Sequence, residues 1–225
     1  MTFSESAWMR VRPWFDAIQV HPFVAALSAG TLASDVFARY LLDDAHYLVG
    51  FARALAVLAT RAPSPEMMEL LARLAAETIA SERALHRAFL VPRGLDPDAP
   101  GAAEPSPTCR AYVGAVLADA SFAPLEIGVA GVLPCFRVYA EVGRILLGTR
   151  PAADHPYRQW IDTYADPAFH DAVHQMEAAA DVLARDASAG RVEAMLDAYE
   201  RATRFEWMFW DAAWHGERWP TPGRT

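Results

Sequence analysis

The spacing of apolar residues is the feature that most constrains the fold, because they recur every three or four positions along most of the 225-residue chain. This period matches one face of an α-helix, and the alternating pattern of half-buried strands is rare. Proline-containing segments such as 63–65 and 92–94 divide the pattern into separate helices. The sequence therefore predicts an all-α fold, a bundle of about seven or eight helices in a single domain, residues 1–225.

The breaks in the pattern give approximate bounds for the helices. Ser34 and Asp166 are suited to cap the helices that begin near them, and Pro65 and Pro167 are suited to first turns. Residues 96–107 are rich in proline, alanine and aspartate, and we interpret them as a surface crossover. The predicted helices are 34–60, 66–89, 108–118, 124–147, 156–164, 167–188 and 191–214.

Charge and composition exclude several classes of function. The net charge of −8 disfavours binding to nucleic acid or to an anionic membrane surface. All 20 basic residues are arginine, so Schiff-base lysines and the phosphate-binding lysine of a P-loop are excluded. The N-terminus has no secretory signal pattern, and the longest apolar run, 127–136, is too short to cross a bilayer. With only two cysteines, we expect a cytoplasmic protein without a disulfide scaffold.

The segment VLPCFRVYAEVG, residues 132–143, places a proline directly before one of the two cysteines. Pro134 lacks the N–H that a helix interior uses, so we expect a kink that opens local space at Cys135. Tyr139 follows four residues later and shares the same helical face. Cys135 is therefore a candidate nucleophile, whereas Cys109 has no such neighbours and reads as a small buried hydrophobe.

Two acidic positions stand out within apolar segments. Asp43 and Asp44 lie in the middle of the helix predicted at 34–60, and because adjacent residues are turned by about 100° one of them can face inward. Glu206 lies in FEWMFWDAAW, residues 205–214, among aromatic residues that include Phe209. A carboxyl group among rings has a raised pKa and can transfer protons near neutral pH. The alternative for the aspartates is an exposed or salt-bridged surface position. For Glu206 it is an aromatic stripe of the core from which the carboxyl group reaches toward solvent.

These segments together resemble the TenA family, also called thiaminase II or aminopyrimidine aminohydrolase, in its cysteine-containing branch. The resemblance covers nearly the whole chain, and the order and spacing of the segments fit. The matching segments are DAHYL (44–48), LPCFRVYAEVG (133–143), YRQWIDTY (157–164) and FEWMFWD (205–211).

The resemblance implies a haem-oxygenase-like multi-helix bundle, often a homotetramer, with no metal or organic cofactor. It implies hydrolysis of 4-amino-5-aminomethyl-2-methylpyrimidine to its hydroxymethyl counterpart in thiamine salvage, with thiamine as a poorer substrate. Cys135 would be the nucleophile and Glu206 the group that transfers protons. The residues that would bind the pyrimidine are Asp44, Tyr47, Tyr112, Tyr139, Tyr164 and Phe209.

The chain departs from the family pattern at a few positions. Arg137 follows Phe136 where many relatives carry a second aromatic residue, and we expect Arg137 to point away from the site. Trp214 stands where a tyrosine is common, and His46 lies between Asp44 and Tyr47.

Two alternatives stay open. One is a di-metal carboxylate site in a helical bundle, for which Glu82, His86, His170, His174 and Glu177 have helical spacings. The other is a non-catalytic helical protein that binds a pyrimidine or regulates a partner. Binding alone would not need a thiol, so the Asp–Cys–Glu set favours the enzyme.

Overall fold

Ten α-helices and one 3₁₀ helix make up the regular structure of residues 1–96 and 104–221, which are the residues that the computed structural model describes apart from the side chain of Glu82. These residues contain no strand, so the all-α prediction is confirmed. The helices are α1 (Phe3–Arg10), α2 (Arg12–Gln19), α3 (Pro22–Ala29), α4 (Ser34–Thr60), α5 (Pro65–Phe89), η1 (Val91–Arg93), α6 (Pro107–Phe122), α7 (Leu125–Gly148), α8 (Arg158–Ala165), α9 (Pro167–Arg185) and α10 (Ala189–His215).

The predicted helices agree with α4 to α10, and the differences lie at their ends. Ser34 begins α4 rather than capping it, because Ala33 is the N-cap. Helix α6 continues past the predicted end at 118 to Phe122, and α9 ends at Arg185 rather than 188. The predicted crossover falls mainly on residues 97–103, outside the described part.

Side-chain caps explain where several helices begin. The hydroxyl oxygens of Ser64, Ser106 and Ser188 accept hydrogen bonds from backbone N–H groups at the starts of α5, α6 and α10. The Asp166 carboxylate accepts from the Ala168 N–H at 2.7 Å, which confirms it as the cap of α9. Each cap satisfies an N–H that has no partner within its own helix.

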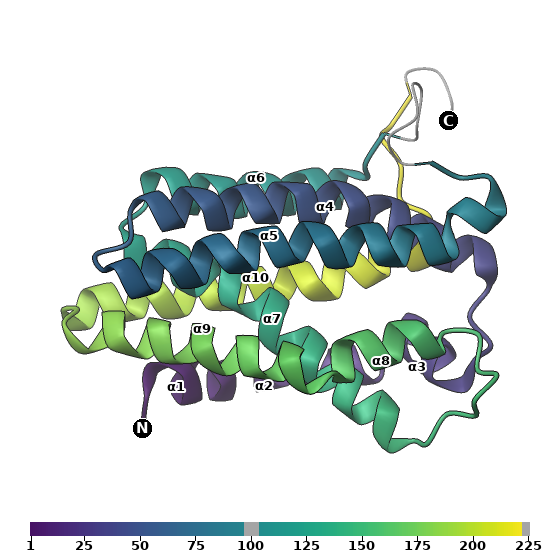
Figure 1. The fold of residues 1–225 in the computed structure, drawn as a ribbon, viewed down its shortest axis with the longest axis horizontal. Coiled ribbons are helices and arrows are strands. Elements are labelled where there is room, and N and C mark those ends of the chain that lie inside the picture. Colours follow the sequence, from purple (N-terminus) through teal and green to yellow (C-terminus); the bar gives the residue numbers. More distant parts are fainter. Residues whose placement is uncertain (97–103, 222–225) are drawn as a thin grey trace.

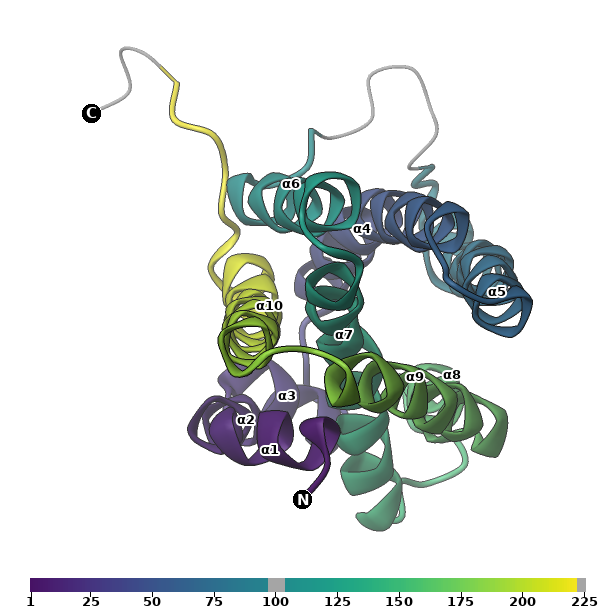
Figure 2. The same ribbon diagram turned by 90° about the vertical axis from the view of Figure 1, so that its left-hand side faces the viewer.

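The helices form layers around α7, as Figures 1 and 2 show. Helices α6, α4 and α5 lie side by side along one side of the molecule, and α10 lies next to α7. Helices α8 and α9 pack on α7, and α1–α3 lie along α10 at the opposite side from α6. Each of the ten α-helices contributes residues to one continuous buried cluster.

Helix α7 supplies the centre of the core and continues through Pro134, so the proline does not end the helix. Arg137 ties this helix to its neighbours. Its guanidinium donates to Glu177 of α9 at 2.8 Å, pairs with Glu141 at 3.1 Å, and lies 4.9 Å from the ring centroid of Trp8 in α1. Charge pairing and a cation–π contact therefore hold α1 and α9 against α7.

Two elements approach each other closely at Gly143. A Cβ atom on Gly143 would lie 2.6 Å from both the carbonyl carbon and the carbonyl oxygen of Tyr164. Backbone atoms cannot move aside as a flexible side chain can, so only glycine lets α8 rest on α7 at this distance. Gly143 therefore sets the depth at which Tyr164 is held.

None of the helices in the described residues is both long and apolar enough to span a lipid bilayer.

Replacing Gly143 with alanine tests this close approach. The Gly143→Ala variant is expected to lose about 1–3 kcal/mol of unfolding free energy, because the added methyl group overpacks a fixed backbone. Gly114 of α6 has no atom within 4 Å of its Cβ position and is the matched control. The Gly114→Ala variant is expected to be neutral or stabilised by up to about 1 kcal/mol. Urea unfolding measures both values, and equal stabilities would contradict the explanation.

Candidate active site

A cavity of about 650 Å³ lies between α4 and α5 on one side and α7, α8 and α9 on the other. Its size falls in the range of about 300–1,000 Å³ that encloses small organic ligands. Apolar and aromatic side chains form part of its lining, including Phe51 and Phe136. Among the residues predicted for the site, those that line the cavity are Asp44, Tyr47, Cys135, Tyr139 and Tyr164.

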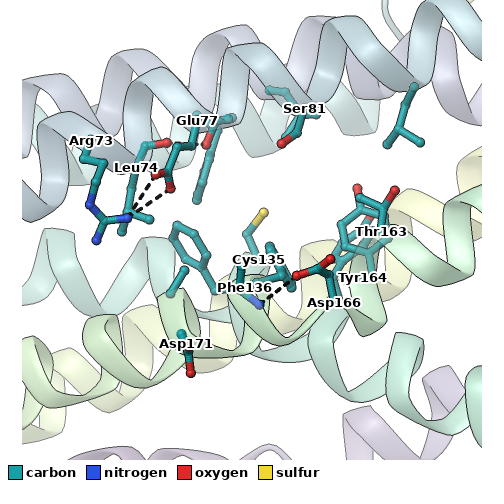
Figure 3. A pocket seen from close by; sticks show the side chains of 18 of the residues that line it. Arg73, Leu74, Glu77, Ser81, Cys135, Phe136, Thr163, Tyr164, Asp166 and Asp171 are labelled. Carbon is teal, nitrogen blue, oxygen red and sulfur yellow. Dashed lines mark hydrogen bonds and ion pairs between the residues drawn. The ribbon is translucent and has the colours of Figure 1, made fainter.

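Cys135 projects its sulfur into this cavity from α7, toward the facing helix α5 (Figure 3). Its side chain is a free thiol. Burial raises the pKa of the Cys135 thiol well above its usual range, and the nearby Glu206 and Asp44 carboxylates raise it further, while the Tyr47 hydroxyl opposes the shift. Cys135 therefore favours the thiol form, and a base is needed to form a thiolate.

Asp44 is the inward-facing member of the acidic pair on α4. It is only 2% exposed and lines the cavity near Cys135. Its neighbour Asp43 turns the other way and accepts a hydrogen bond from the Ser106 N–H at 2.9 Å, at the start of α6. The two adjacent acids therefore have different tasks: Asp43 holds the α6 start, and Asp44 supplies charge to the cavity.

Glu206 lies one layer behind the cavity wall. Its carboxyl group accepts a hydrogen bond of 2.6 Å from the Tyr112 hydroxyl, and the residue is 1% exposed. Burial raises the pKa of Glu206 to about 8; the Asp44 charge acts in the same direction and the Tyr112 hydrogen bond opposes it. A carboxyl group with this pKa exchanges protons near neutral pH, as the sequence interpretation requires.

Aromatic rings connect Glu206 to the cavity. Tyr112 packs against Tyr47 with 4.5 Å between ring centroids, and Phe209 meets Tyr47 edge-on at 5.6 Å. Tyr47 itself lines the cavity, and its hydroxyl is buried without a hydrogen-bond partner among the described residues. A ligand with an acceptor would satisfy this hydroxyl, which otherwise bears a desolvation cost.

The opposite wall is a second aromatic group. Tyr139 packs against Tyr164 with ring centroids 4.8 Å apart, and the Tyr40 hydroxyl donates a hydrogen bond to the Tyr139 hydroxyl at 3.3 Å. The indole N–H of Trp160 in turn donates to the Tyr40 oxygen at 3.3 Å. This chain fixes the orientation of the Tyr139 phenol at the edge of the cavity. Sequence reasoning did not include Tyr40 or Trp160 in the site.

The structure thus brings five of the eight predicted site residues to the cavity surface. The other three, Glu206, Tyr112 and Phe209, do not line this cavity. Tyr112 and Phe209 pack against Tyr47, which does, and Glu206 accepts a hydrogen bond from Tyr112. Cys109 is fully buried outside the cavity and donates to the Asp43 carbonyl oxygen, in agreement with its interpretation as a structural residue. Arg137 and His46 do not line the cavity either.

Sequence reasoning missed the side of the cavity that α5 and the α8–α9 junction provide. Arg73, Glu77 and Ser81 recur every four residues and so lie on one face of α5, directed toward the cavity in Figure 3. Asp166 and Asp171 belong to the lining on the α8–α9 side, where the Asp166 carboxylate caps α9 and the Asp171 carboxylate points away from α5 in Figure 3. A polar stripe of this kind is typical of a solvated helix face, so its pattern alone did not indicate a site.

The geometry does not favour the di-metal alternative. The described residues contain no group of three or more His, Cys, Asp or Glu side chains placed to hold a metal ion. Glu177 instead accepts from Arg137 and lies 3.4 Å from His174. The Glu82 side chain falls outside the described part of the structure.

Known proteins resemble this chain in both sequence and fold. The aminopyrimidine aminohydrolase of Bacillus subtilis (strain 168) is 32% identical over 97% of this chain and 92% of its own length. The thiamine biosynthesis multifunctional protein ThiED of Corynebacterium efficiens is 40% identical over 65% of this chain, and the match spans only 19% of ThiED.

Solved structures agree with these matches. A TenA homologue from P. horikoshii OT3 is 28% identical and superposes with a TM-score of 0.86, over 96% of this chain and 100% of that one. A domain with a heme oxygenase-like fold from Shewanella denitrificans has a TM-score of 0.73 over 92% of this chain and 90% of that one. Its 13% identity shows the fold alone, and it confirms the predicted haem-oxygenase-like bundle. The model of the TENA/THI-4/PQQC family matches residues 8–216, and this chain therefore belongs to that family.

Proposed function

We propose that this chain is an aminopyrimidine aminohydrolase (thiaminase II) that converts 4-amino-5-aminomethyl-2-methylpyrimidine and water to the hydroxymethylpyrimidine and ammonia. The observation that carries the proposal is a thiol and a carboxylate, Cys135 and Asp44, that line one aromatic-walled cavity, with Glu206 of raised pKa directly behind its wall. The similarity to the Bacillus subtilis aminopyrimidine aminohydrolase over 97% of the chain supports the same activity.

The cavity suits a flat, nitrogen-rich ring. The Tyr47 ring and the Tyr139–Tyr164 pair provide aromatic faces and edges against which a pyrimidine can pack. The Asp44 carboxylate accepts hydrogen bonds from the amino group and from a protonated ring nitrogen. The unpartnered Tyr47 hydroxyl adds a donor for a ring nitrogen. Together these groups orient the exocyclic methylene toward the thiol.

Cys135 then acts as the nucleophile. Because burial disfavours its thiolate, the proton must move to a base as the sulfur attacks, and the Glu206 carboxylate is that base. The sulfur adds to the ring carbon next to the one that carries the methylene, forming a C–S bond. The displaced electron pair expels the amine from the methylene, and Glu206 returns a proton to it.

Water completes the cycle. Glu206, now ionised, takes a proton from a water molecule that adds to the exposed methylene carbon. The electron pair returns to the ring, the C–S bond breaks, and the ring regains its aromaticity with a hydroxymethyl group. One glutamate of pKa about 8 thus serves each proton transfer in turn.

We also propose a cellular compartment for the protein. Two buried free cysteines, Cys109 and Cys135, fit a reducing compartment, so we assign the protein to the cytoplasm. Assembly into a homotetramer stays a prediction from the family resemblance.

The Cys135→Ser variant tests the nucleophile and separates the enzyme from a binding protein. We expect ammonia release from the aminomethylpyrimidine to fall by about 10³-fold or more, while calorimetry still detects binding of the pyrimidine. Cys109→Ser is the matched control, since Cys109 lies outside the cavity and its partner is a backbone carbonyl. A wild-type protein that binds the pyrimidine without releasing ammonia would favour the non-catalytic alternative.

The pH profile tests Glu206. The productive state needs one proton shared between the Cys135 thiol and the Glu206 carboxyl, so the doubly protonated pair is inactive. Accordingly kcat/KM is expected to rise with pH, with a midpoint near 8 where Glu206 ionises. Glu206→Gln should abolish this rise and lower the rate by about 10²–10⁴-fold. The exposed Glu69, replaced by Gln, should keep the wild-type profile. A rise that persists in Glu206→Gln would reject this role.

The same pKa predicts a change in stability. In the folded state Glu206 holds its proton up to about pH 8, whereas its ordinary value is 4.5. Its contribution to stability is therefore fully present below pH 4.5 and is lost as the pH rises through 8. Thermal unfolding between pH 5 and pH 9 should show a steeper loss of stability in the wild type than in Glu206→Gln. Parallel curves would contradict the raised pKa.

A further inference from the structure

Three aromatic side chains form a hydrogen-bonded line that ends at the cavity wall. The indole N–H of Trp160 in α8 donates to the Tyr40 hydroxyl oxygen at 3.3 Å, and the Tyr40 hydroxyl donates to the Tyr139 oxygen at 3.3 Å. Tyr139 lines the cavity, whereas Trp160 and Tyr40 lie behind it. Both are 0% exposed, so bulk water does not compete for their hydrogen bonds.

The chemistry of the indole group fixes the direction of this line. An indole nitrogen can only donate a hydrogen bond, whereas a phenol can donate or accept. The Tyr40 oxygen therefore accepts from Trp160, and the single hydrogen of the Tyr40 hydroxyl is used on Tyr139. The Tyr139 oxygen accepts in turn, and its own hydrogen is directed to a different partner.

The Tyr139 hydroxyl keeps that hydrogen at neutral pH. Burial raises the pKa of the Tyr139 phenol well above its usual range, and its ionisable neighbours, which include Glu206 and Asp44, raise it further. The Tyr139 ring packs against the rings of Tyr164 and Trp210, with centroids 4.8 Å and 5.3 Å apart, and Tyr139 also lines the cavity. A ligand in the cavity therefore meets this hydroxyl as a hydrogen-bond donor.

A fixed donor sets a requirement on the ligand. Asp44, one helical turn after Tyr40 on α4, gives the cavity an acceptor, and Tyr139 gives it a donor. A 4-aminopyrimidine matches both, because its amino group donates and a ring nitrogen carries a lone pair. A ring that presents an N–H to Tyr139 would place two donors against each other, and a buried donor without an acceptor is costly.

We propose that Trp160 and Tyr40 are positioning residues that hold Tyr139 as a hydrogen-bond donor to the substrate, so that the site selects rings with an unprotonated nitrogen facing Tyr139. The inference rests on the proposed function, because the ring in the cavity must be the aminopyrimidine. Without the Tyr40 hydroxyl, the Tyr139 oxygen is released to accept from a ligand. Without the Trp160 N–H, Tyr40 can accept from Tyr139, and the direction of the line is no longer fixed.

Two analogues of the hydroxymethylpyrimidine product measure this selection. In each analogue one ring nitrogen is replaced by C–H, which removes one acceptor. Calorimetry gives the ratio of the analogue's Kd to the Kd of 4-amino-5-hydroxymethyl-2-methylpyrimidine. For the nitrogen that faces Tyr139, we expect a wild-type ratio of about ten or more, and Tyr139→Phe should lower that ratio by about fivefold or more. The ratio for the other nitrogen should not change in Tyr139→Phe.

A double variant separates positioning from a general structural effect. Tyr40→Phe should lower the ratio for the facing nitrogen by about threefold or more. Because Tyr40 acts only through the Tyr139 hydroxyl, Tyr40→Phe combined with Tyr139→Phe should give the same ratio as Tyr139→Phe alone. Trp160→Phe keeps an aromatic ring and should shift the ratio in the same direction as Tyr40→Phe, which provides the test if Tyr40→Phe folds poorly.

The matched control is Tyr157→Phe. It removes another buried hydroxyl, which donates to the Leu32 carbonyl oxygen at 2.6 Å and lies outside the cavity. This variant should keep the wild-type ratio. Melting curves show whether each variant is folded at the temperature of the binding measurement.

The outcomes distinguish this inference from the proposed function. A wild type that binds the pyrimidine but releases no ammonia from the aminomethylpyrimidine would reject the proposed function, and one that does not bind the pyrimidine would overturn both. If the wild type releases ammonia, wild-type ratios in Tyr40→Phe and Trp160→Phe would overturn the positioning role alone. Effects of Tyr40→Phe and Tyr139→Phe that multiply in the double variant would also overturn it, as would an equal change in Tyr157→Phe.

Discussion

The burial of two carboxyl groups beside a thiol is the constraint on which the rest of this structure depends. An isolated charge in a protein interior is expensive, so buried acids need partners or hold their protons. Glu206 does both, since it accepts from Tyr112 and its pKa rises to about 8. Long helices and a dense aromatic layer exclude water from this region. The same exclusion raises the pKa of Glu206 into the range that suits proton transfer near neutral pH.

The positions of the helices serve this burial. Helix α7 carries Cys135 toward the cavity and Arg137 away from it, because the two residues are separated by about 200° around the helix axis. One side of α7 therefore faces the cavity. The other side holds α9 through the Arg137 ion pair and α1 through the cation–π contact of Arg137 with Trp8. Gly143, two turns further along, brings α8 close enough for Tyr164 to reach the cavity wall. Structural and chemical tasks are thus divided by helix face.

Parts of the structure with a distinctive sequence pattern were predicted, and parts without one were not. Helix α4 was predicted with its bounds because a long apolar period ends near Pro63. The three N-terminal helices were missed, since each has only eight residues and Pro13 and Pro22 interrupt the period. Cys135 and Asp44 are unusual within apolar segments and were found. Arg73 and Glu77 look like any exposed helix face, so their place at the cavity required the packing of α5 opposite α9.

The unequal surroundings of the two cysteines have a practical consequence for chemical biology. Cys109 is sealed in the core, whereas Cys135 opens onto a cavity that small molecules can enter. An alkylating reagent that fits the cavity would therefore attach at one place in the native chain, and a pyrimidine that fills the cavity would shield it. Since burial raises the pKa of the Cys135 thiol, weak electrophiles would react slowly at neutral pH. Selective covalent inhibitors would need to combine ring recognition with a strong warhead.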